Sequence, residues 1–203
     1  MNQNRVMTHK ILPFRRVAGV STEMSDEALL AACAIGENVA LGALFDRHHD
    51  AVRRFLARLS GTDDRDLDDL VQMTFETLPR AARRFDGRSA VKTWLFGVAS
   101  NVARHHVRSE IRRKRVAEAA ATDPRPDAVD GSEDVLQRER SQRLHDAIVA
   151  LPARLREAFV LVYLENIPGA EVARLVGARE GTIWKRLHQA RAQLREALGG
   201  VFP

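Results

Sequence analysis

The residues best suited to binding chemistry lie between positions 179 and 195. A helix beginning near Glu180 would bury apolar residues that recur at intervals of three and four: Ile183, Leu187, Ala190 and Leu194. Its opposite face would carry cations and an amide: Lys185, Arg186, Gln189, Arg191 and Arg195. Such a helix has the size and the hydrogen-bonding groups to enter the major groove of DNA.

A shorter helix is predicted directly before this one. Pro168 stands where a first helical turn tolerates proline, and apolar residues follow with helical spacing up to Leu175. Gly177 can adopt the left-handed backbone that a tight turn between two helices requires. Residues 167–198 are therefore predicted to form a DNA-binding helix-turn-helix. The alternative is an ordinary helical hairpin with a solvated basic face, which explains the turn and the charge less well.

A second basic face is predicted on a helix from Val91 to Arg115. Its apolar stripe is Val91, Trp94, Leu95, Val98 and Val102. Polar residues share another face at steps of three and four: Asn101, Arg104, His105, Arg108, Arg112 and Arg115. A charged run is usually a solvated face, but here only Glu110 opposes the cations. Trp94 could stack on a base, although its spacing favours the core.

Helical periodicity dominates the chain, and the predicted fold class is all-α. Ser25 is the expected N-cap of a first helix, and a longer helix follows from about Val39. Aspartates after Gly61 are expected to open a third helix, which Pro79 should kink or restart. Further helices are expected over residues 135–150 and 153–164.

The composition of the chain changes between the two basic helices. Residues 117–134 contain prolines, glycine and serine without periodicity, which indicates a flexible linker. The predicted organisation is a disordered N-terminal extension (1–24), a first helical domain (25–116), this linker (117–134) and a second helical domain with the helix-turn-helix (135–203).

Charge and composition favour a polyanionic partner and a binding function. The 203 residues carry a net charge of +5, and Cys33 is the only cysteine, which excludes an internal disulfide framework and a cysteine-based zinc cluster. No apolar run approaches the roughly 18 residues of a membrane span, and no secretory signal core is found, so the cytoplasm is expected.

Catalysis and metal binding are not expected from this sequence. It has no phosphate-cradling loop, nucleophile elbow or catalytic carboxylate pair, so an enzyme is not predicted. The pairs His48-His49 and His105-His106 invite a metal interpretation. Adjacent residues on a helix point about 100° apart, however, and no partner four residues away is evident, so no metal or cofactor is predicted.

Several linked motifs resemble the bacterial RNA polymerase sigma factors. Residues 69–75 (Asp-Leu-Val-Gln-Met-Thr-Phe), 85–87 (Phe-Asp-Gly), 91–95 (Val-Lys-Thr-Trp-Leu) and 99–103 (Ala-Ser-Asn-Val-Ala) are similar to their region 2. Residues 151–191, including Gly181-Thr182-Ile183, resemble their region 4. With only these two regions and a short linker, residues 25–198 are similar to the extracytoplasmic-function (ECF) type.

The resemblance implies partners for each face. Core RNA polymerase would be bound through its β′ clamp helices and its β subunit, with β′ contacted by Asp69, Gln72, Met73 and Glu76. Relatives commonly have glutamate where Met73 stands, so apolar packing would replace one polar contact. The alternative for Gln72 is a plain exposed polar residue. A cognate anti-sigma factor is a further expected partner; membrane insertion is not expected.

Promoter DNA would be contacted at two elements. An opened strand of the −10 element needs a pocket for an unstacked base and cations for its phosphates. The residues that would contact it are Phe85, Arg88, Ser89, Asn101, Arg104, His105 and Arg108. The −35 element would meet Arg179, Thr182, Trp184, Lys185, Arg186, His188, Gln189 and Arg191. Of these, Trp184, Lys185, His188 and Gln189 would face bases and the others phosphates. Relatives are often basic where Trp184 stands, so its contact would be apolar, for example with a thymine methyl group.

These observations favour a dissociable polymerase subunit that selects promoters and helps to open them. One alternative is a free-standing regulator that uses the helix-turn-helix alone, which leaves residues 25–115 without a role. Another is an interaction protein whose basic faces are masked.

Overall fold

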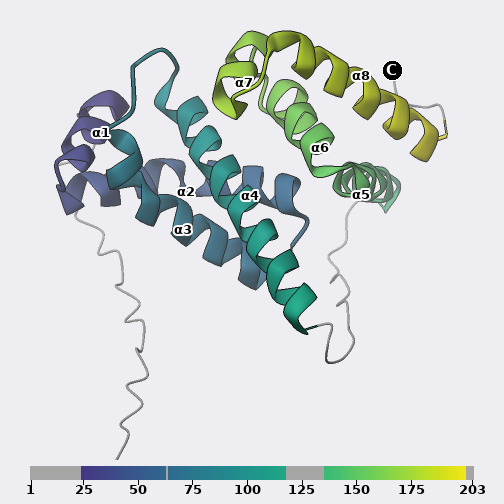
Figure 1. Ribbon diagram of the computed structural model, residues 1–203, viewed down its shortest axis with the longest axis horizontal. Coiled ribbons are helices and arrows are strands. Elements are labelled where there is room, and N and C mark those ends of the chain that lie inside the picture. The colour runs from purple at the N-terminus through teal and green to yellow at the C-terminus, as the bar shows by residue number, and fades with distance from the viewer. Residues whose placement is uncertain (1–23, 63, 118–134, 200–203) are drawn as a thin grey trace, which may run out of the picture.

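The computed structural model describes the backbone of residues 24–62, 64–117 and 135–199, and the side chains of 24–62, 65–106 and 141–199. All secondary structure in this part of the chain is helical (Figure 1). In chain order the helices are α1 (Asp26–Ala34), α2 (Asn38–Ser60), α3 (Asp64–Ala82), α4 (Val91–Ala117), α5 (Val135–Ala150), α6 (Ala153–Phe159), the π-helical turn η1 (Val160–Leu164), α7 (Gly169–Val176) and α8 (Glu180–Ala197).

Helices α1 to α4 form a first block around one apolar core. Phe55 of α2, Phe75 of α3 and Leu95 of α4 are completely buried within it. The rings of Phe55 and Phe96 stack with their centroids 4.6 Å apart, which joins α2 to α4. These residues belong to the apolar stripes of their helices, so burial of the stripes brings the block together.

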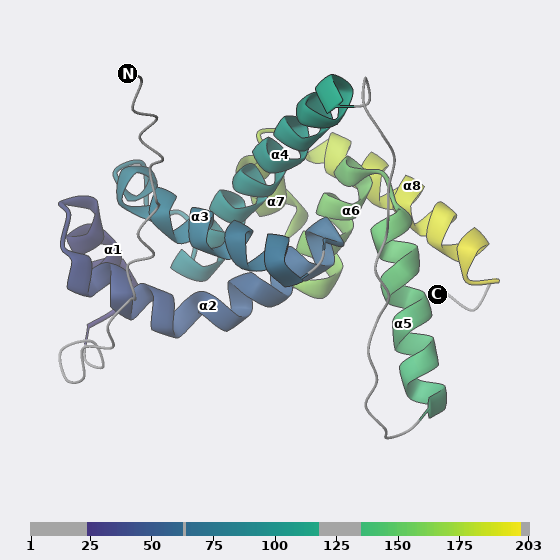
Figure 2. The ribbon, with the colours of Figure 1, turned by 90° about the horizontal axis from the view of Figure 1, so that it is seen from below.

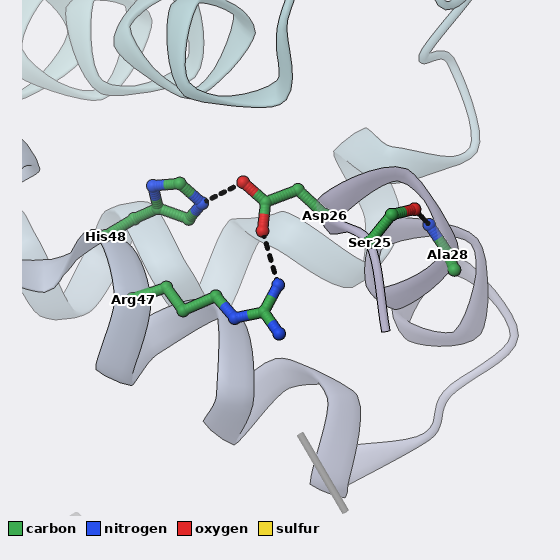
Figure 3. A network of polar contacts seen from close by, with 5 residues as sticks. All are labelled: Ser25, Asp26, Ala28, Arg47 and His48. Atoms are coloured by element: carbon green, nitrogen blue, oxygen red, sulfur yellow. Dashed lines mark hydrogen bonds and ion pairs between the residues drawn. The ribbon is translucent and has the colours of Figure 1, made fainter. Parts of the chain in front are cut away.

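Helix α1 is fixed at its beginning by a polar network (Figure 3). Ser25 is the N-cap, as predicted, and its hydroxyl accepts a hydrogen bond of 3.2 Å from the backbone N–H of Ala28. The carboxylate of Asp26 contacts Arg47 and His48 of α2, each at 2.7 Å. The network therefore ties α1 to α2 at the edge of the core.

Helix α3 continues through Pro79 to Ala82, so it does not restart at the proline. Pro79 lies only three residues before the end of the helix, so its missing N–H costs a single hydrogen bond within the last turn. The predicted extension and linker fall largely on residues 1–23 and 118–134, which lie outside the described part of the chain. Ala117, which was expected in the linker, is the last residue of α4.

Helices α5 to α8 form a second block. The helix expected over residues 153–164 consists of α6 followed by the π-helical η1. Gly177 has a φ of 64°, and this left-handed residue separates α7 from α8 as the sequence predicts. Helices α7 and α8 are thus a helix-turn-helix supported by α6.

The two blocks contact each other. Helix α4 packs against α7, and α2 packs against α5, α6 and η1. Figures 1 and 2 both show α7 beside the N-terminal half of α4, with α8 on the outer side of the second block. None of the described helices is long and apolar enough to cross a membrane.

Candidate nucleic-acid interface

The recognition helix α8 buries the stripe that the sequence predicts: Ile183, Leu187, Ala190 and Leu194. Its other face is open to solvent. The candidate −35 residues that are exposed are Arg179, Thr182, Trp184, Lys185, His188, Gln189 and Arg191. Seven side chains with donors, acceptors or an aromatic ring therefore share the accessible surface of one helix and its N-cap. This arrangement suits a helix that lies in the major groove.

Trp184 is held on this surface by two contacts. Its side chain is 52% exposed, and its indole Nε1 donates to Oε1 of Glu180 at 3.3 Å. The ring also lies across Gly169, the first residue of α7, where an added Cβ would be 3.1 Å from Cζ2. One face of the indole thus packs within the helix-turn-helix, and the rest is free to meet an apolar group.

Arg186 differs from the other candidate −35 residues. It is half-buried, and its positive charge is one of those that partly oppose the burial-driven rise in the pKa of Glu157 on α6, so it lies toward the interior of the second block. The prediction of a phosphate contact for Arg186 is untested, but this placement makes it the least accessible of the eight.

The loop between α3 and α4 carries the first group of candidate −10 residues. Phe85 and Trp94 are half-buried and meet edge to face, with ring centroids 5.4 Å apart. The carboxylate of Asp86 accepts a hydrogen bond from the backbone N–H of Arg88 at 3.1 Å, which shapes the loop. Arg88 is exposed, and Ser89 is half-buried. Trp94 is thus packed partly against the core, as its spacing favours, and partly against the ring of Phe85.

The second group of candidate −10 residues lies on α4. Asn101 and His105 are exposed, whereas Arg104 is half-buried and donates a hydrogen bond to the amide oxygen of Asn101. The guanidinium of Arg104 also lies 3.6 Å from Oε1 of Glu157 in the second block. Arg108, Arg112 and Arg115 follow on α4, but their side chains lie outside the described part of the chain.

A separate polar face lies on α3. Asp69, Gln72, Met73 and Glu76 are all exposed, and the amide of Gln72 donates to Glu76 at 2.8 Å. Met73 is 40% exposed, which leaves its thioether open to a partner. The opposite side of the helix carries the buried residues Leu70, Phe75 and Leu78. The four residues that the resemblance assigns to polymerase contact therefore share one accessible surface.

The sequence analysis missed Glu157, which is only 3% exposed. Burial raises the pKa of this carboxyl, and the nearby groups Arg104 and Ser100 offset the effect only in part. Within the described part of the chain, neither Ser100 Oγ nor Glu157 Oε1 has a hydrogen-bond partner. A clue was present in the sequence, because Glu157 immediately precedes the apolar run from Ala158 to Val162.

The two histidines of the pair His48-His49 contact different residues of the protein. His48 contacts Asp26, while His49 contacts Asp50 at 3.1 Å and packs against the ring of Phe45. Among the described side chains, no group of three or more histidines, cysteines or carboxylates is gathered as a metal site. Cys33 is buried, and burial raises the pKa of its thiol to about 11.

Comparisons with known proteins match the same two segments. Residues 44–113 match the family "Sigma-70 region 2", and residues 141–194 match "Sigma-70, region 4". Among curated relatives, the ECF RNA polymerase sigma factor SigM of Mycobacterium tuberculosis is 34% identical over 177 residues, which are 87% of this chain and 86% of that protein.

Solved structures give the same result for the fold. RpoE of Bartonella quintana, in complex with the anti-sigma factor NepR, superposes with a TM-score of 0.61 at 27% identity, over 76% of this chain and 94% of that chain. CnrH, in complex with the cytosolic domain of CnrY, gives a TM-score of 0.60 at 26% identity, over 87% and 98%. The two matched regions, the all-helical fold and the extent of the similarity to SigM together show that the chain belongs to the ECF RNA polymerase sigma factors.

Proposed function

We propose that three surfaces, on α3, on α4 with the loop before it, and on α8, carry out the separate binding functions of a sigma subunit. The α3 face (Asp69, Gln72, Met73 and Glu76) would dock on the β′ clamp helices of core polymerase, with the β subunit as a further contact. The −10 face, composed of Phe85, Arg88, Ser89, Asn101, Arg104, His105 and Arg108, would hold the opened strand. The −35 face on α8 would bind duplex DNA.

The observation that carries this proposal is that the candidate −10 and −35 residues lie on separate helical blocks of one chain. A single helix-turn-helix would read one element of a promoter, whereas two blocks in one chain can read two elements at once. The α3 face supports the same proposal, because a surface exposing Met73 beside carboxylates and an amide suits a protein partner better than DNA. A free-standing regulator would leave that face and the whole first block without a role.

The proposal describes a binding protein and not an enzyme. The protein would act in the cytoplasm, where core polymerase and promoters are found. One of the two similar solved structures is a complex with an anti-sigma factor, and the other is a complex with the cytosolic domain of CnrY, so a cognate anti-sigma factor is part of the proposal.

Reconstitution with core polymerase tests this function. Purified chain is mixed with core enzyme, passed over a size-exclusion column, and assayed for transcripts from a pool of randomised promoters. We expect co-elution and transcripts whose templates share two sequence elements. Failure to co-elute, with no transcripts above those of core enzyme alone, would refute the proposal.

A further inference from the structure

The corner where α1 meets the start of α2 carries a cluster of exposed apolar side chains. Met24 is 37% exposed, Val39 is 44% exposed, and Ile35, in the turn between the two helices, is 80% exposed. Single exposed apolar residues are ordinary on a protein surface, whereas a cluster of them marks a place where another group binds. Figures 1 and 2 both place α1 at the end of the first block that lies away from the second block, so the described helices of the second block do not cover this corner.

A cavity of about 150 Å³ lies at this corner. Its lining is almost entirely apolar, and the largest contributors are Met24, Leu29 of α1 and Val39 of α2. Pockets for drug-sized ligands begin at roughly 300 Å³. An apolar cavity of about 150 Å³, by contrast, can take up benzene. The size and the lining of the cavity therefore fit a single aromatic side chain.

The chain enters this corner directly from residues 1–23. Phe14 is the only phenylalanine, tyrosine or tryptophan in those residues, and it ends the apolar run of residues 11–14 (Ile-Leu-Pro-Phe). Met24, the first described residue, itself lines the cavity. Phe14 precedes Met24 by ten positions. A chain of this length spans about 16–19 Å on average and about 33–36 Å when fully extended. Phe14 can therefore reach the cavity without any movement of α1 or α2.

Charges on the two sides are complementary. Arg15 and Arg16 follow Phe14 directly, whereas Glu37 is exposed and is the one charged residue that lines the cavity. Glu37 is the N-cap residue of α2, but its side chain makes no capping hydrogen bond, so the helix does not occupy its carboxylate. An exposed ion pair adds little affinity, but it can fix the direction in which a bound segment runs.

We propose that the segment around Phe14 docks on the corner of α1 and α2, with its phenyl ring in the cavity and one of the following arginines beside Glu37. The neighbouring apolar residues of the segment would cover Ile35. A short segment needs no core of its own if a preformed surface receives it. None of the residues that line the cavity belongs to the three surfaces of the proposed function, so the docking does not depend on that function.

A single aromatic anchor suffices because the segment and the cavity belong to one chain. As a separate molecule, a group of this size binds only weakly, since the cost of association is large relative to one ring. A short covalent connection raises the effective concentration of the segment to about the millimolar range. A second copy of the chain would have to reach a comparable concentration to compete for the cavity.

Trypsin cleavage of the full chain measures the docking, because the protease cuts only the undocked fraction of a segment that exchanges rapidly. The folded protein is digested briefly, and the fragments are quantified by mass spectrometry. We expect cleavage after Arg15 and Arg16 to be at least about threefold slower than in a synthetic peptide of residues 1–23, which corresponds to about two thirds of the molecules docked. Cleavage after Arg5, outside the docked stretch, should proceed at the rate of the peptide and is the internal reference.

A variant of the cavity tests where the segment binds. Val39→Asp replaces an apolar wall with a carboxylate and should raise cleavage after Arg15 and Arg16 to the rate of the peptide. An aspartate in the first turn of α2 suits the positive end of the helix, so the fold is retained. Asn38→Asp is the matched control: it adds the same charge one residue earlier, does not line the cavity and should leave the protection unchanged.

Phe14→Ala tests the same contact from the segment, where it cannot disturb the helices. Compared with a peptide that carries the same substitution, this variant should lose its protection. Combined with Val39→Asp it should be cleaved no faster than either single variant, because both changes remove one contact. Cleavage of the parent chain at the rate of the peptide would overturn the proposal, as would protection that survives Val39→Asp. Protection that increases with protein concentration would place the segment on a second copy and would overturn it as well.

Discussion

The indole ring of Trp184 on the recognition helix lies across Gly169 at the start of α7. An added Cβ at Gly169 would be 3.1 Å from Cζ2 and 3.4 Å from Cε2 of this ring. The side chain with the largest exposed apolar surface on the −35 face is thus positioned by the neighbouring helix. The orientation of the indole on the candidate −35 face therefore depends on Gly169, which is a buried residue of the preceding helix.

Gly169→Ala should change how the −35 element is read. The new methyl group displaces the indole by a few tenths of an ångström, and we expect an altered base preference at the position that Trp184 faces. Stability should change by less than about 1 kcal/mol, because the exposed side of the ring is free to move. Gly181→Ala is the matched control, since nothing lies within 4 Å of its added Cβ. Identical preferences for both variants in a −35 library would contradict this role.

Lys185 and Arg191 should behave differently in the same library. Lys185 lies two residues beyond buried Ile183 and so points away from the core, toward the groove. We expect Lys185→Ala to relax the preference at one or two base pairs by about 1–3 kcal/mol. Arg191→Ala should lower activity on every promoter and reduce its salt dependence. A uniform loss for Lys185→Ala would make this residue a phosphate anchor instead.

The α3 face is tested by the double variant Asp69→Ala, Gln72→Ala. Both side chains are exposed, so the fold should be retained while association with core polymerase weakens by about tenfold or more. Asp46→Ala on the exposed side of α2 removes a carboxylate elsewhere and serves as the control. Affinity is measured by titration of fluorescently labelled chain with core enzyme. If the double variant binds as tightly as Asp46→Ala, the assignment of this face is wrong.

The Asp26 network should make the stability of the first block depend on acid. Partial burial alone would raise the pKa of Asp26, but the hydrogen bond from Arg47 and the interactions with His48 outweigh it, so the pKa lies below its ordinary value. A carboxyl group whose pKa is lowered in the folded protein stabilises the fold at pH values above its ordinary pKa of about 4. This stabilisation is lost as the pH falls through the lowered pKa.

Asp26→Asn should therefore reduce the free energy of unfolding by about 1 kcal/mol near pH 7. The difference from the parent should shrink as the pH falls below about 4. The difference in the free energy of unfolding is measured by urea unfolding, followed by circular dichroism at several pH values, with Asp46→Asn as the control. A difference that stays constant with pH would show that the charge of Asp26 is not the cause.

Much of this architecture is predictable from local patterns. Ser25 as an N-cap, Gly177 as the left-handed turn and the Ile183–Leu194 stripe are determined by residues within a few positions of one another, and each is confirmed. The packing of Leu175 on Gly97 and of Glu157 near Arg104 joins residues far apart in the chain. Helical periodicity identifies a buried face but does not say which helix covers it, so these contacts required the structure.

In the candidate site, too, some features follow from local patterns and others depend on contacts between distant residues. Exposure of Lys185, Gln189 and Gln72 follows from their helical positions and was predictable. The partial burial of Arg104 was not, because its charge and its spacing both indicate a solvated face. Arg104 contacts Asn101 on its own helix and lies near Glu157 of the second block, and the second contact joins residues that the sequence separates by a linker.

Footprinting of one promoter, with the chain alone and with core polymerase, tests the central claim most directly. Two small basic blocks bind DNA weakly until a scaffold fixes their spacing, because the ordering cost opposes binding. We predict protection of two separate elements, at −10 and −35, only when chain and core polymerase are both present. Nanomolar, site-specific protection of duplex DNA by the chain alone would contradict the account and favour a free-standing regulator.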